Sequence, residues 1–459
     1  MTAGQMRLLN GWGRTAASSA AVIRPGSSAA VAHAFQNAGP RGVLPRGLGR
    51  SYGDVAQNAG GTVLDMTGMG GIVALDVTAG TLTAMAGESL DSVLRAVVPQ
   101  GWFLPVTPGT RFVTLGGAIA NDVHGKNHHV EGSLGHHLLA FDLVTPAGSE
   151  LTVTPENDPA LFAATLGGMG LTGVITQATI RLLPITTSRI RQDTDRCAGI
   201  DDLMAKMTSG DAGYRYSVAW IDCLSRGAAL GRAVLTRGDH ADPGELPHPH
   251  QLAPLRYGPR ALPSVPAGMP DIASALTARA FNELWFRKAL SQERGRIVPI
   301  TSFFYPLDVV GDWNRIYGRR GFVQYQFVVP FAGDGVIRGT LDRLARARCP
   351  SFLAVLKRFG PGRGMLSFPM EGWTLAMDIP AGDPGVAELL DSVDREVAEA
   401  GGRVYLAKDS RLDPAMVPAM YPDLDRWLEV RECVDPQQLL RSDMSRRLNL
   451  DRSSAGVSV

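Results

Sequence analysis

The sequence lacks the features that mark several common protein classes. Its 459 residues contain four cysteines, at positions 197, 223, 349 and 433, and none is close to another. This spacing excludes a CxxC pair, a zinc knuckle and a disulfide framework, and it favours a reducing compartment. No uncharged apolar run reaches about 18 residues, and the N-terminus has neither an apolar signal core nor a twin-arginine motif. We therefore expect no transmembrane helix and no signal peptide, while peripheral membrane contact stays open.

The charge balance excludes a dedicated nucleic-acid binder. Lys and Arg number 45 against 44 Asp and Glu, which gives a net charge of +1, whereas such binders carry a clear basic excess. Hydrophobic residues make up 45% of the chain, which indicates a globular protein. The 53 glycines follow no Gly-X-Y period, so we expect them in tight turns and in loops that approach a ligand closely. At roughly 100–200 residues per domain, the length predicts two or three domains.

The sequence pattern changes near residue 188. Before it, short β-like runs alternate with glycine-rich turns, and apolar residues at helical spacing follow residue 90. After it, eight prolines between residues 243 and 270 exclude regular structure and predict a long surface loop. Asp-Pro pairs at 413 and 435 predict two helix starts, the second with Gln438 completing a capping box. The other expected elements are strands at 63–66, 71–75, 81–85, 174–182, 214–222 and 321–331 and a helix at 272–290.

The first glycine-rich loop is RGLGRSYGD, from Arg46 to Asp54. Its glycines allow several backbone N–H groups to converge on an anion such as a pyrophosphate. A plain β-turn is the alternative reading. Gly53 comes one residue too late for a dinucleotide fingerprint, and the formal G-x-G-x-x-G at 168–173 opens a strand instead of a helix. The sequence therefore argues against a nicotinamide-binding Rossmann fold.

The segment PGTRFVTLGGAIANDVHGKNHH, residues 108–129, combines paired glycines, small residues and histidines. His124 and His128 have the spacing of a metal-binding helix. Gly125 and Asn127 weaken such a helix, and no carboxylate has a familiar ligand spacing, so we expect no metal site. A loop that packs against a flat cofactor, with His124 and Lys126 directed into the site, is the favoured interpretation.

Two short segments offer further polar groups. In GFVQYQFVVP, residues 321–330, Gln324 and Gln326 share one face of a strand and the apolar residues share the other. These amides would either bind hydroxyl groups in a pocket or face solvent on an edge strand. Lys408 follows a short strand and is by default exposed to solvent. If it faces a pocket, it would stabilise an anion or, with a pKa lowered by burial, act as a base.

The helix expected at 272–290 has a broad apolar face next to basic residues. Such a face is usually part of a core, but beside a proline-rich loop it would also suit contact with a lipid surface. The apolar residues are Ile272, Leu276, Ala280, Phe281, Leu284 and Trp285, and the basic ones are Arg279, Arg287 and Lys288.

Taken in order, RGLGRSYGD, PGTRFVTLGGAIANDVHGKNHH, GGMGLTGVIT and YLAKDSR resemble the vanillyl-alcohol-oxidase type of FAD-dependent oxidoreductases. The resemblance is strongest to the branch that oxidises decaprenylphosphoryl-β-D-ribose, and it runs from Gly11 to Leu448. It implies an α+β fold in which residues 1–187 and 402–459 form an FAD-binding domain of the PCMH type. Residues 188–401 would form an inserted substrate domain on an antiparallel sheet, with a mobile loop at about 240–270.

The resemblance also implies which residues hold FAD. Related sugar oxidases carry a histidine in the first glycine-rich loop that bonds covalently to the flavin. Arg50 stands at that position here, which implies non-covalent FAD. The expected cofactor residues are Arg46, Gly47, Leu48, Gly49, Arg50, Ser51, Tyr52, Gly53, Asp54, Gly109, Thr110, Thr114, Leu115, Gly116, Gly117, Asn121, Asp122, Val123, His124, Ile175 and Tyr405.

The implied reaction is oxidation of the ribose 2′-hydroxyl of a polyprenylphosphoryl-β-D-ribose to a ketone, with the hydride passing to the flavin and a protein base taking the proton. An NADH-dependent keto-reductase partner would then complete the epimerisation to the arabinose donor of cell-wall arabinan. The protein would be cytoplasmic or peripheral on the membrane, or on its periplasmic face through a partner. The catalytic candidates are Lys408, His124 and Tyr52, with the base open between the first two, and the substrate candidates are Lys126, Trp220, Gln324, Gln326 and Lys357.

The sequence departs from the family pattern at two places. Ala376 replaces a cysteine that some members carry and that nitroaromatic inhibitors modify, so we expect no covalent adduct here. At Phe304-Tyr305, relatives combine an aromatic residue and a histidine differently. Two other hypotheses stay open: a soluble FAD-dependent alditol or sugar oxidase that uses O₂, and a flavin-free carbohydrate- or lipid-binding protein.

Overall fold

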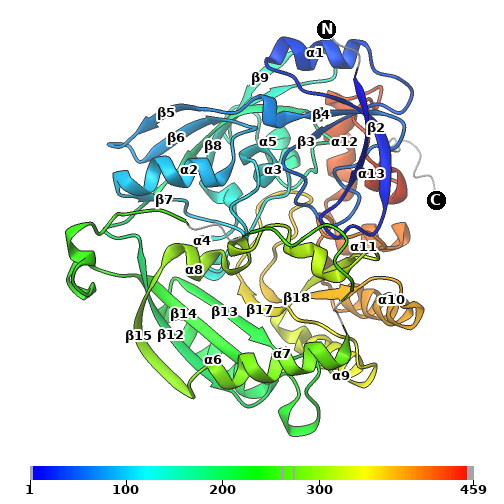
Figure 1. Ribbon diagram of the computed structural model, residues 1–459. Helices are drawn as coiled ribbons and strands as arrows, with labels where there is room; N and C mark the ends of the chain where they lie inside the picture. Colours follow the sequence, from blue (N-terminus) through cyan, green and yellow to red (C-terminus); the bar gives the residue numbers. More distant parts are fainter. Residues whose placement is uncertain (1–3, 260–262, 272–273, 452–459) are drawn as a thin grey trace.

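The computed structural model describes residues 4–259, 263–271 and 274–451. Figure 1 shows the N-terminal sheets, in blue and cyan, stacked on a large sheet in green and yellow, with the C-terminal helices beside both. Residues 1–3, 260–262, 272–273 and 452–459 lie outside the description. They include Ile272, the outer ends of the predicted FAD-binding segments 1–187 and 402–459, and part of the proline-rich loop. In the described part of that loop, regular structure is limited to short 3-10 turns at 243–245 and 250–252.

The N-terminal part contains a four-stranded and a five-stranded sheet, in the orders β1-β2-β4-β3 and β5-β6-β10-β8-β9. The helix expected after residue 90 is α2 (Leu90–Val97), capped by Ser89 and buried along its apolar stripe. The other elements are β1 (Gln5–Asn10), β2 (Ala17–Ile23), α1 (Ser28–Gln36), β3 (Val43–Arg46), β4 (Thr62–Asp65), β5 (Ile72–Asp76), β6 (Thr81–Met85), β7 (Trp102–Phe103), α3 (Leu115–Ala120), α4 (His128–Glu131), β8 (Leu138–Val144), β9 (Glu150–Val153), α5 (Pro159–Thr165), β10 (Val174–Arg181) and β11 (Leu183–Pro184).

The inserted part is built on an eight-stranded sheet in which all neighbouring strands are antiparallel, as expected. Its order is β15-β12-β14-β13-β17-β18-β16-β19. The elements are β12 (Arg189–Cys197), α6 (Ile200–Gly210), β13 (Tyr216–Ile221), β14 (Ala233–His240), α7 (Ala275–Lys288), β15 (Gln292–Pro299), α8 (Ile300–Phe304), β16 (Phe322–Val329), α9 (Asp334–Arg346), β17 (Ala354–Phe359), β18 (Gly372–Pro380), α10 (Pro384–Glu399) and β19 (Arg403–Val404).

Strand β16 confirms the predicted alternation. Tyr325 and Phe327 are buried in the core against residues of α9 and α10, while Gln324 and Gln326 lie on the opposite face and are also buried. Because β16 is flanked by β18 and β19, the interpretation as a solvated edge strand is wrong.

After β19 the chain returns to the N-terminal part. Helices α11 (Val417–Met420), α12 (Leu424–Val434) and α13 (Asp443–Arg447) follow. The indole of Trp427 donates to the carbonyl of Ala164 over 3.0 Å, and Asp443 accepts from the backbone of Ala59 over 2.8 Å. Residues 405–408 therefore lie where the returning chain passes between the large sheet and the first glycine-rich loop, as the bond from the Tyr52 N–H to the Ala407 carbonyl shows.

One predicted helix start is wrong. Asp413 caps a 3-10 turn, Pro414–Met416, that leads into α11. Asp435, however, follows the end of α12, and its carboxylate accepts from the backbone N–H groups of Leu439 and Leu440, each over 2.8 Å. The carboxylate therefore closes an irregular turn, which is the alternative that Asp offers to helix capping.

Candidate active site

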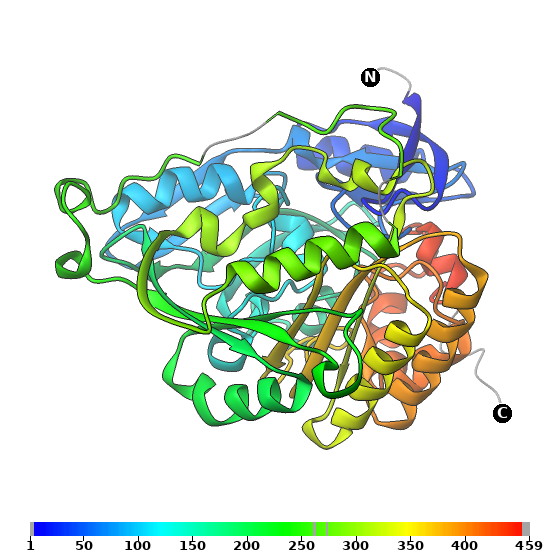
Figure 2. The ribbon, with the colours of Figure 1, turned by 60° about the horizontal axis from the view of Figure 1, so that its bottom comes forward.

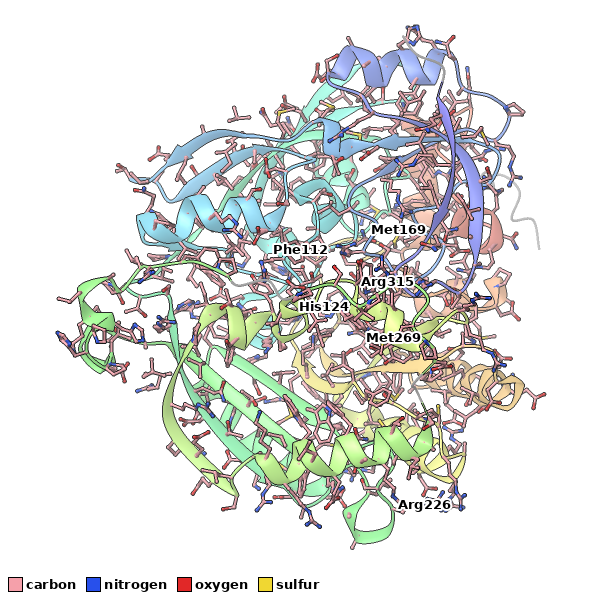
Figure 3. The ribbon with its side chains drawn as sticks, viewed as in Figure 1. Phe112, His124, Met169, Arg226, Met269 and Arg315 are labelled. Atoms are coloured by element: carbon pink, nitrogen blue, oxygen red, sulfur yellow. The ribbon has the colours of Figure 1, made fainter. Side chains whose placement is uncertain are left out.

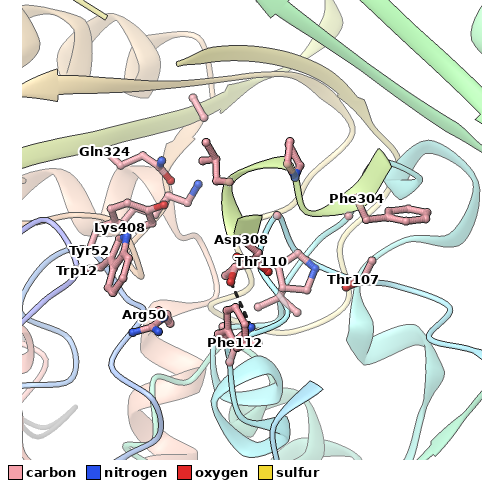
Figure 4. Close-up of a pocket in the computed structure, with 18 of the residues that line it drawn as sticks. Trp12, Arg50, Tyr52, Thr107, Thr110, Phe112, Phe304, Asp308, Gln324 and Lys408 are labelled. Atoms are coloured by element: carbon pink, nitrogen blue, oxygen red, sulfur yellow. Dashed lines mark hydrogen bonds between the residues drawn. The ribbon is translucent and has the colours of Figure 1, made fainter. Parts of the chain in front are cut away.

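A cavity of about 1440 Å³ lies between the N-terminal sheets and the large sheet. It exceeds the roughly 300–1,000 Å³ of pockets that hold one small ligand, so it has room for a cofactor and a second molecule. Figure 3 places Phe112 and His124 where the two halves meet. In Figure 4, Lys408, Gln324 and Tyr52 lie on one side of the cavity, and Asp308, Thr110 and Phe112 lie on the other.

The two glycine-rich motifs of the sequence meet in the cavity wall. A Cβ atom on Gly47 would lie 2.1 Å from Oγ1 of Thr114, and one on Gly49 would lie 2.3 Å from the guanidinium of Arg46. Gly49 also has a φ of +65°, in the left-handed region. Within the described residues, the backbone N–H groups of 47–51 have no acceptor in the protein. These donors are therefore free to bond a ligand, and convergent backbone N–H groups in such a loop fit an anion such as a pyrophosphate.

Most of the residues expected to hold FAD line this cavity. Two further groups suit the polar edge of a flat cofactor, because Oδ1 of Asn121 and Nδ1 of His124 are buried and unpaired within the described structure. The residues that line the wall are Arg46, Gly47, Leu48, Gly49, Arg50, Ser51, Tyr52, Gly109, Thr110, Thr114, Gly116, Gly117, Asn121, Val123, His124, Ile175 and Tyr405.

Four of the expected cofactor residues do not line the cavity. The carboxylate of Asp54 pairs with Arg447 at 2.8 Å, and Gly53 packs against the backbone of Asp409, so both fix the loop to the C-terminal segment. Leu115 belongs to the hydrophobic core. Asp122 is buried and accepts from the backbone of Gly135 and the hydroxyl of Ser367. These residues support the cradle from behind.

Three lysines and a histidine line the cavity, and burial is the main cause that disfavours the charged form of each. Burial, then the charge of Lys357, lowers the pKa of Lys408 to about 7, while the carboxylate of Asp378 opposes this shift. Burial lowers the pKa of Lys357 to about 8. Burial and Lys357 lower that of Lys126 to about 7. A substantial fraction of the Lys408 amine is therefore neutral near pH 7, and the expectation of an exposed Lys408 is wrong.

His124 is held in one tautomer. The amide nitrogen of Gln326 lies 3.1 Å from Nε2 of His124 and donates to the hydroxyl of Thr374 over 3.0 Å. That hydroxyl donates in turn to the carbonyl of Phe327, which fixes the orientation of the amide. Nε2 of His124 is therefore an acceptor, and Nδ1 carries the proton. Burial, then Lys357 and Lys408, lowers the pKa of His124 well below its ordinary value, so the ring is a neutral donor.

Asp378 is a site residue that was not among the residues predicted from the sequence. Its carboxylate lines the cavity and accepts from the amide of Gln324 over 2.5 Å. Burial raises its pKa to about 7. The signal was present in Trp373-Thr-Leu-Ala-Met-Asp378, where Asp378 and Ala376 stand two residues apart and therefore share one face of strand β18. Both line the cavity, and Ala376 offers no thiol there.

The predicted substrate residues separate into two groups. Lys126, Trp220, Gln324 and Lys357 line the cavity. Lys126 also donates to the carbonyl of Phe303, and Trp220 donates to that of Phe352 over 3.3 Å. The prediction of Gln326 as a substrate residue is wrong, because this side chain lies behind His124 and does not reach the cavity wall.

The phenol of Tyr305 is also held behind the wall. It bonds to the hydroxyl of Thr107 over 2.6 Å, and of the pair Phe304-Tyr305 only Phe304 lines the cavity. The departure from the family at this pair therefore affects one wall residue.

The described residues hold no group of three His, Cys, Asp or Glu side chains that could bind a metal ion. Nδ1 of His128 accepts from the backbone of Gly360 instead. Across residues 4–259, 263–271 and 274–451, none of the helices has the length and apolar character needed to cross a bilayer.

Comparison with known proteins agrees with this geometry. Residues 19–154 match the family of FAD binding domains, and residues 377–448 match D-arabinono-1,4-lactone oxidase. The decaprenylphosphoryl-β-D-ribose oxidase of Mycolicibacterium smegmatis is 43% identical over 96% of this chain and 97% of its own. An uncharacterized protein of Streptomyces coelicolor is 40% identical over 79% of this chain and 100% of its own. L-gulono-1,4-lactone dehydrogenase of Mycobacterium tuberculosis is 22% identical over 93% of this chain and 95% of its own.

The cradle, the two-domain α+β fold and these relatives all indicate the same cofactor, FAD. The chain belongs to the family of FAD-dependent oxidoreductases that includes decaprenylphosphoryl-β-D-ribose oxidase.

Proposed function

We propose that the protein oxidises the ribose 2′-hydroxyl of a polyprenylphosphoryl-β-D-ribose to the 2′-ketone. FAD, when bound, accepts the hydride from the ribose carbon. The observation that carries the proposal is that a cofactor cradle and a buried group of lysines share one cavity, whose wall continues into the aromatic residues Trp220, Phe281 and Trp285. Reduction of the flavin by such a substrate in the absence of oxygen tests it.

The lysines and the aromatic wall suit different parts of this substrate. Lys357 and Lys126 are placed to bind a phosphate or sugar oxygen, because both amines line the cavity and Lys357, with a pKa of about 8, is mostly charged near pH 7. The aromatic wall suits the polyprenyl chain. Phe281 and Trp285 are stacked with centroids 5.9 Å apart, and Trp285 lies 6.5 Å from Trp220.

We assign the base to Lys408. Its amine is partly neutral near pH 7, faces the cavity and lies over the rings of Tyr52 and Tyr405, 5.5 and 5.8 Å from their centroids. His124 is a poor acceptor because Nε2 already receives the Gln326 amide and Nδ1 carries a hydrogen. In this proposal Lys408 takes the hydroxyl proton. His124 orients the cofactor or the sugar through Nδ1–H, and Tyr52 covers the amine.

Asp378→Asn should move the acid limb of flavin reduction to lower pH. The carboxylate of Asp378 favours the charged form of Lys408, so its removal lowers the pKa of the amine. The base is then neutral at a lower pH, and the rate holds further into the acid range. The measurement is the pH dependence of the anaerobic reduction rate with excess substrate.

Asp394→Asn is the matched control for this variant. Asp394 is also a buried carboxylate with a pKa raised to about 7, but it bonds Tyr325 and Arg411 away from the cavity. We expect its acid limb to stay in place. An acid limb that is the same in Asp378→Asn and in the wild type would remove Asp378 from the proton balance of Lys408.

We also propose that FAD is bound without a covalent bond. Arg50 lines the cavity with its guanidinium 4.1 Å from the ring centroid of Trp12, and a guanidinium offers no counterpart to the histidine linkage of related sugar oxidases. Acid precipitation should release all the yellow colour into the supernatant. Flavin that stays with the precipitate would contradict this.

The remaining proposals concern partners. An NADH-dependent keto-reductase would reduce the ketone. The protein would meet its lipid-linked substrate at a membrane surface, either as a cytoplasmic or peripheral protein or through a partner that brings it there.

The match of residues 377–448 to D-arabinono-1,4-lactone oxidase favours one other candidate, oxidation of a small soluble sugar. Bleaching of the flavin by simple alditols or lactones instead of phosphoryl ribose would establish that alternative.

A further inference from the structure

Helix α7 presents apolar side chains to solvent. Leu276 is 78% exposed and Leu284 is 69% exposed, and Leu290, just after the helix, is 60% exposed. Leu276 and Leu284 lie two turns apart on the same side, with Ala280 between them. The prediction of a core face is wrong, because the buried residues are Ala278 and Asn282. Single exposed leucines are ordinary on a protein surface, whereas this group is contiguous along one helix.

The inner side of α7 is fixed by polar bonds. The amide of Asn282 donates to Asp222 over 2.8 Å, and Glu283 pairs with Arg232 at 2.5 Å. These partners belong to the large sheet and its connections, so the helix cannot roll to bury its leucines without breaking the buried bond between Asn282 and Asp222. The exposed face is therefore a constant feature of the surface.

The charges on this helix are mainly positive. Arg279, Arg287 and Lys288 are exposed, while Glu283 is the only acidic residue of the helix and is bound by Arg232 and Arg287. A second copy of the chain would bring two cationic faces together. An anionic lipid surface complements both the charge and the leucines, as for amphipathic helices that lie in a membrane interface.

The face is continuous with the cavity. Phe281, Trp285, Lys288 and Leu290 belong both to the region of α7 and to the cavity wall. Figure 2 shows α7 lying in front of the large sheet on the side toward the viewer. A molecule anchored in a bilayer under α7 would reach the cavity along these side chains without crossing open water.

We propose that the outer face of α7, with Leu276, Leu284, Leu290, Arg287 and Lys288, is a docking surface for an anionic phospholipid bilayer. It delivers the lipid-linked substrate from the membrane to the cavity, and in that delivery role it rests on the proposed function. The docking itself is a property of the surface alone. It involves no covalent step.

The test is sedimentation of the FAD-loaded full chain with vesicles of phosphatidylcholine and phosphatidylglycerol in equal parts. The wild type should sediment with these vesicles and less with pure phosphatidylcholine. The double variant Leu276→Asp/Leu284→Asp should bind at least about tenfold more weakly, because it loses apolar burial and adds repulsion. The double variant Met6→Asp/Leu8→Asp is the control, since these residues are 62% and 74% exposed on the edge strand β1 and gain the same charge. We expect it to bind as the wild type does.

Three results would overturn the docking surface: a wild type that does not sediment, equal loss of vesicle binding in both double variants, or concentration-dependent dimers that vanish in the α7 variant while its vesicle binding does not change.

Reduction of the flavin by a short-chain, water-soluble phosphoryl ribose without vesicles tests the proposed function separately. The α7 double variant should reduce at the wild-type rate there. A wild type that sediments but is not reduced would leave the surface standing and contradict the oxidase proposal.

Discussion

Replacing Lys408 with alanine should slow anaerobic flavin reduction by roughly 10²–10⁴-fold, the usual contribution of a positioned base, while FAD stays bound. The amine has a pKa of about 7, as Lys126 and Asp378 also do, and it lies beside the cradle over the rings of Tyr52 and Tyr405. FAD should remain because the cradle residues Gly47 to Ser51 are backbone donors that do not depend on the lysine. The measurements are stopped-flow reduction and the flavin-to-protein ratio.

The variant Lys408→Arg separates a base from a fixed charge. A guanidinium keeps the positive charge but does not become neutral in a protein, so it cannot accept the hydroxyl proton. If Lys408 is the base, both variants are slow. Restoration of the rate by arginine would show that Lys408 acts as a charge that stabilises the reduced flavin. A near-normal rate in Lys408→Ala would remove the residue from the mechanism.

Replacing Gly47 with valine should strongly weaken FAD binding. A Cβ atom at this position would lie 2.1 Å from Oγ1 and 3.0 Å from Cγ2 of Thr114, so the first loop cannot keep its place beside the N-terminus of α3. Separation of the two motifs removes the convergent N–H groups that suit the pyrophosphate. We expect a colourless protein with at least about tenfold weaker affinity for added FAD, measured by flavin fluorescence.

Gly335→Val is the control for this variant. Gly335 lies in α9, where a Cβ atom would meet nothing within 4 Å, so the variant should retain both fold and flavin. Circular dichroism of Gly47→Val should also match that of the wild type, because the clash is confined to the cavity wall. A yellow Gly47→Val protein with wild-type affinity would show that the glycine-rich loop is not the cofactor cradle.

Local sequence patterns were enough to predict the parts of the site that depend on backbone conformation. The loop 46–54 and the paired glycines at 116–117 indicate close approach of backbone to a ligand, and the structure brings them together. The alternation of β16 correctly separates Gln324 and Gln326 from Tyr325 and Phe327, because side-chain direction in a strand follows a period of two.

The groups that depend on contacts distant in the sequence were not predictable in this way. Lys408 is buried because the chain returns from β19 beneath loop 46–54, a contact between residues more than 300 positions apart. Gln326 and His124 are 202 residues apart, so nothing local shows that the amide holds the imidazole and not a substrate. Asp435 has the local pattern of an N-cap, yet its carboxylate bonds the following turn. In each case tertiary packing decides between options that the local sequence leaves open.

The visible spectrum of the purified protein without oxygen, before and after addition of polyprenylphosphoryl ribose, tests the central claim most directly. We predict a flavin band that bleaches on addition of this substrate and not on addition of a simple alditol. A band that bleaches only with the alditol would contradict the substrate assignment. A protein that shows no flavin band even after FAD is added back would contradict the enzymatic account itself.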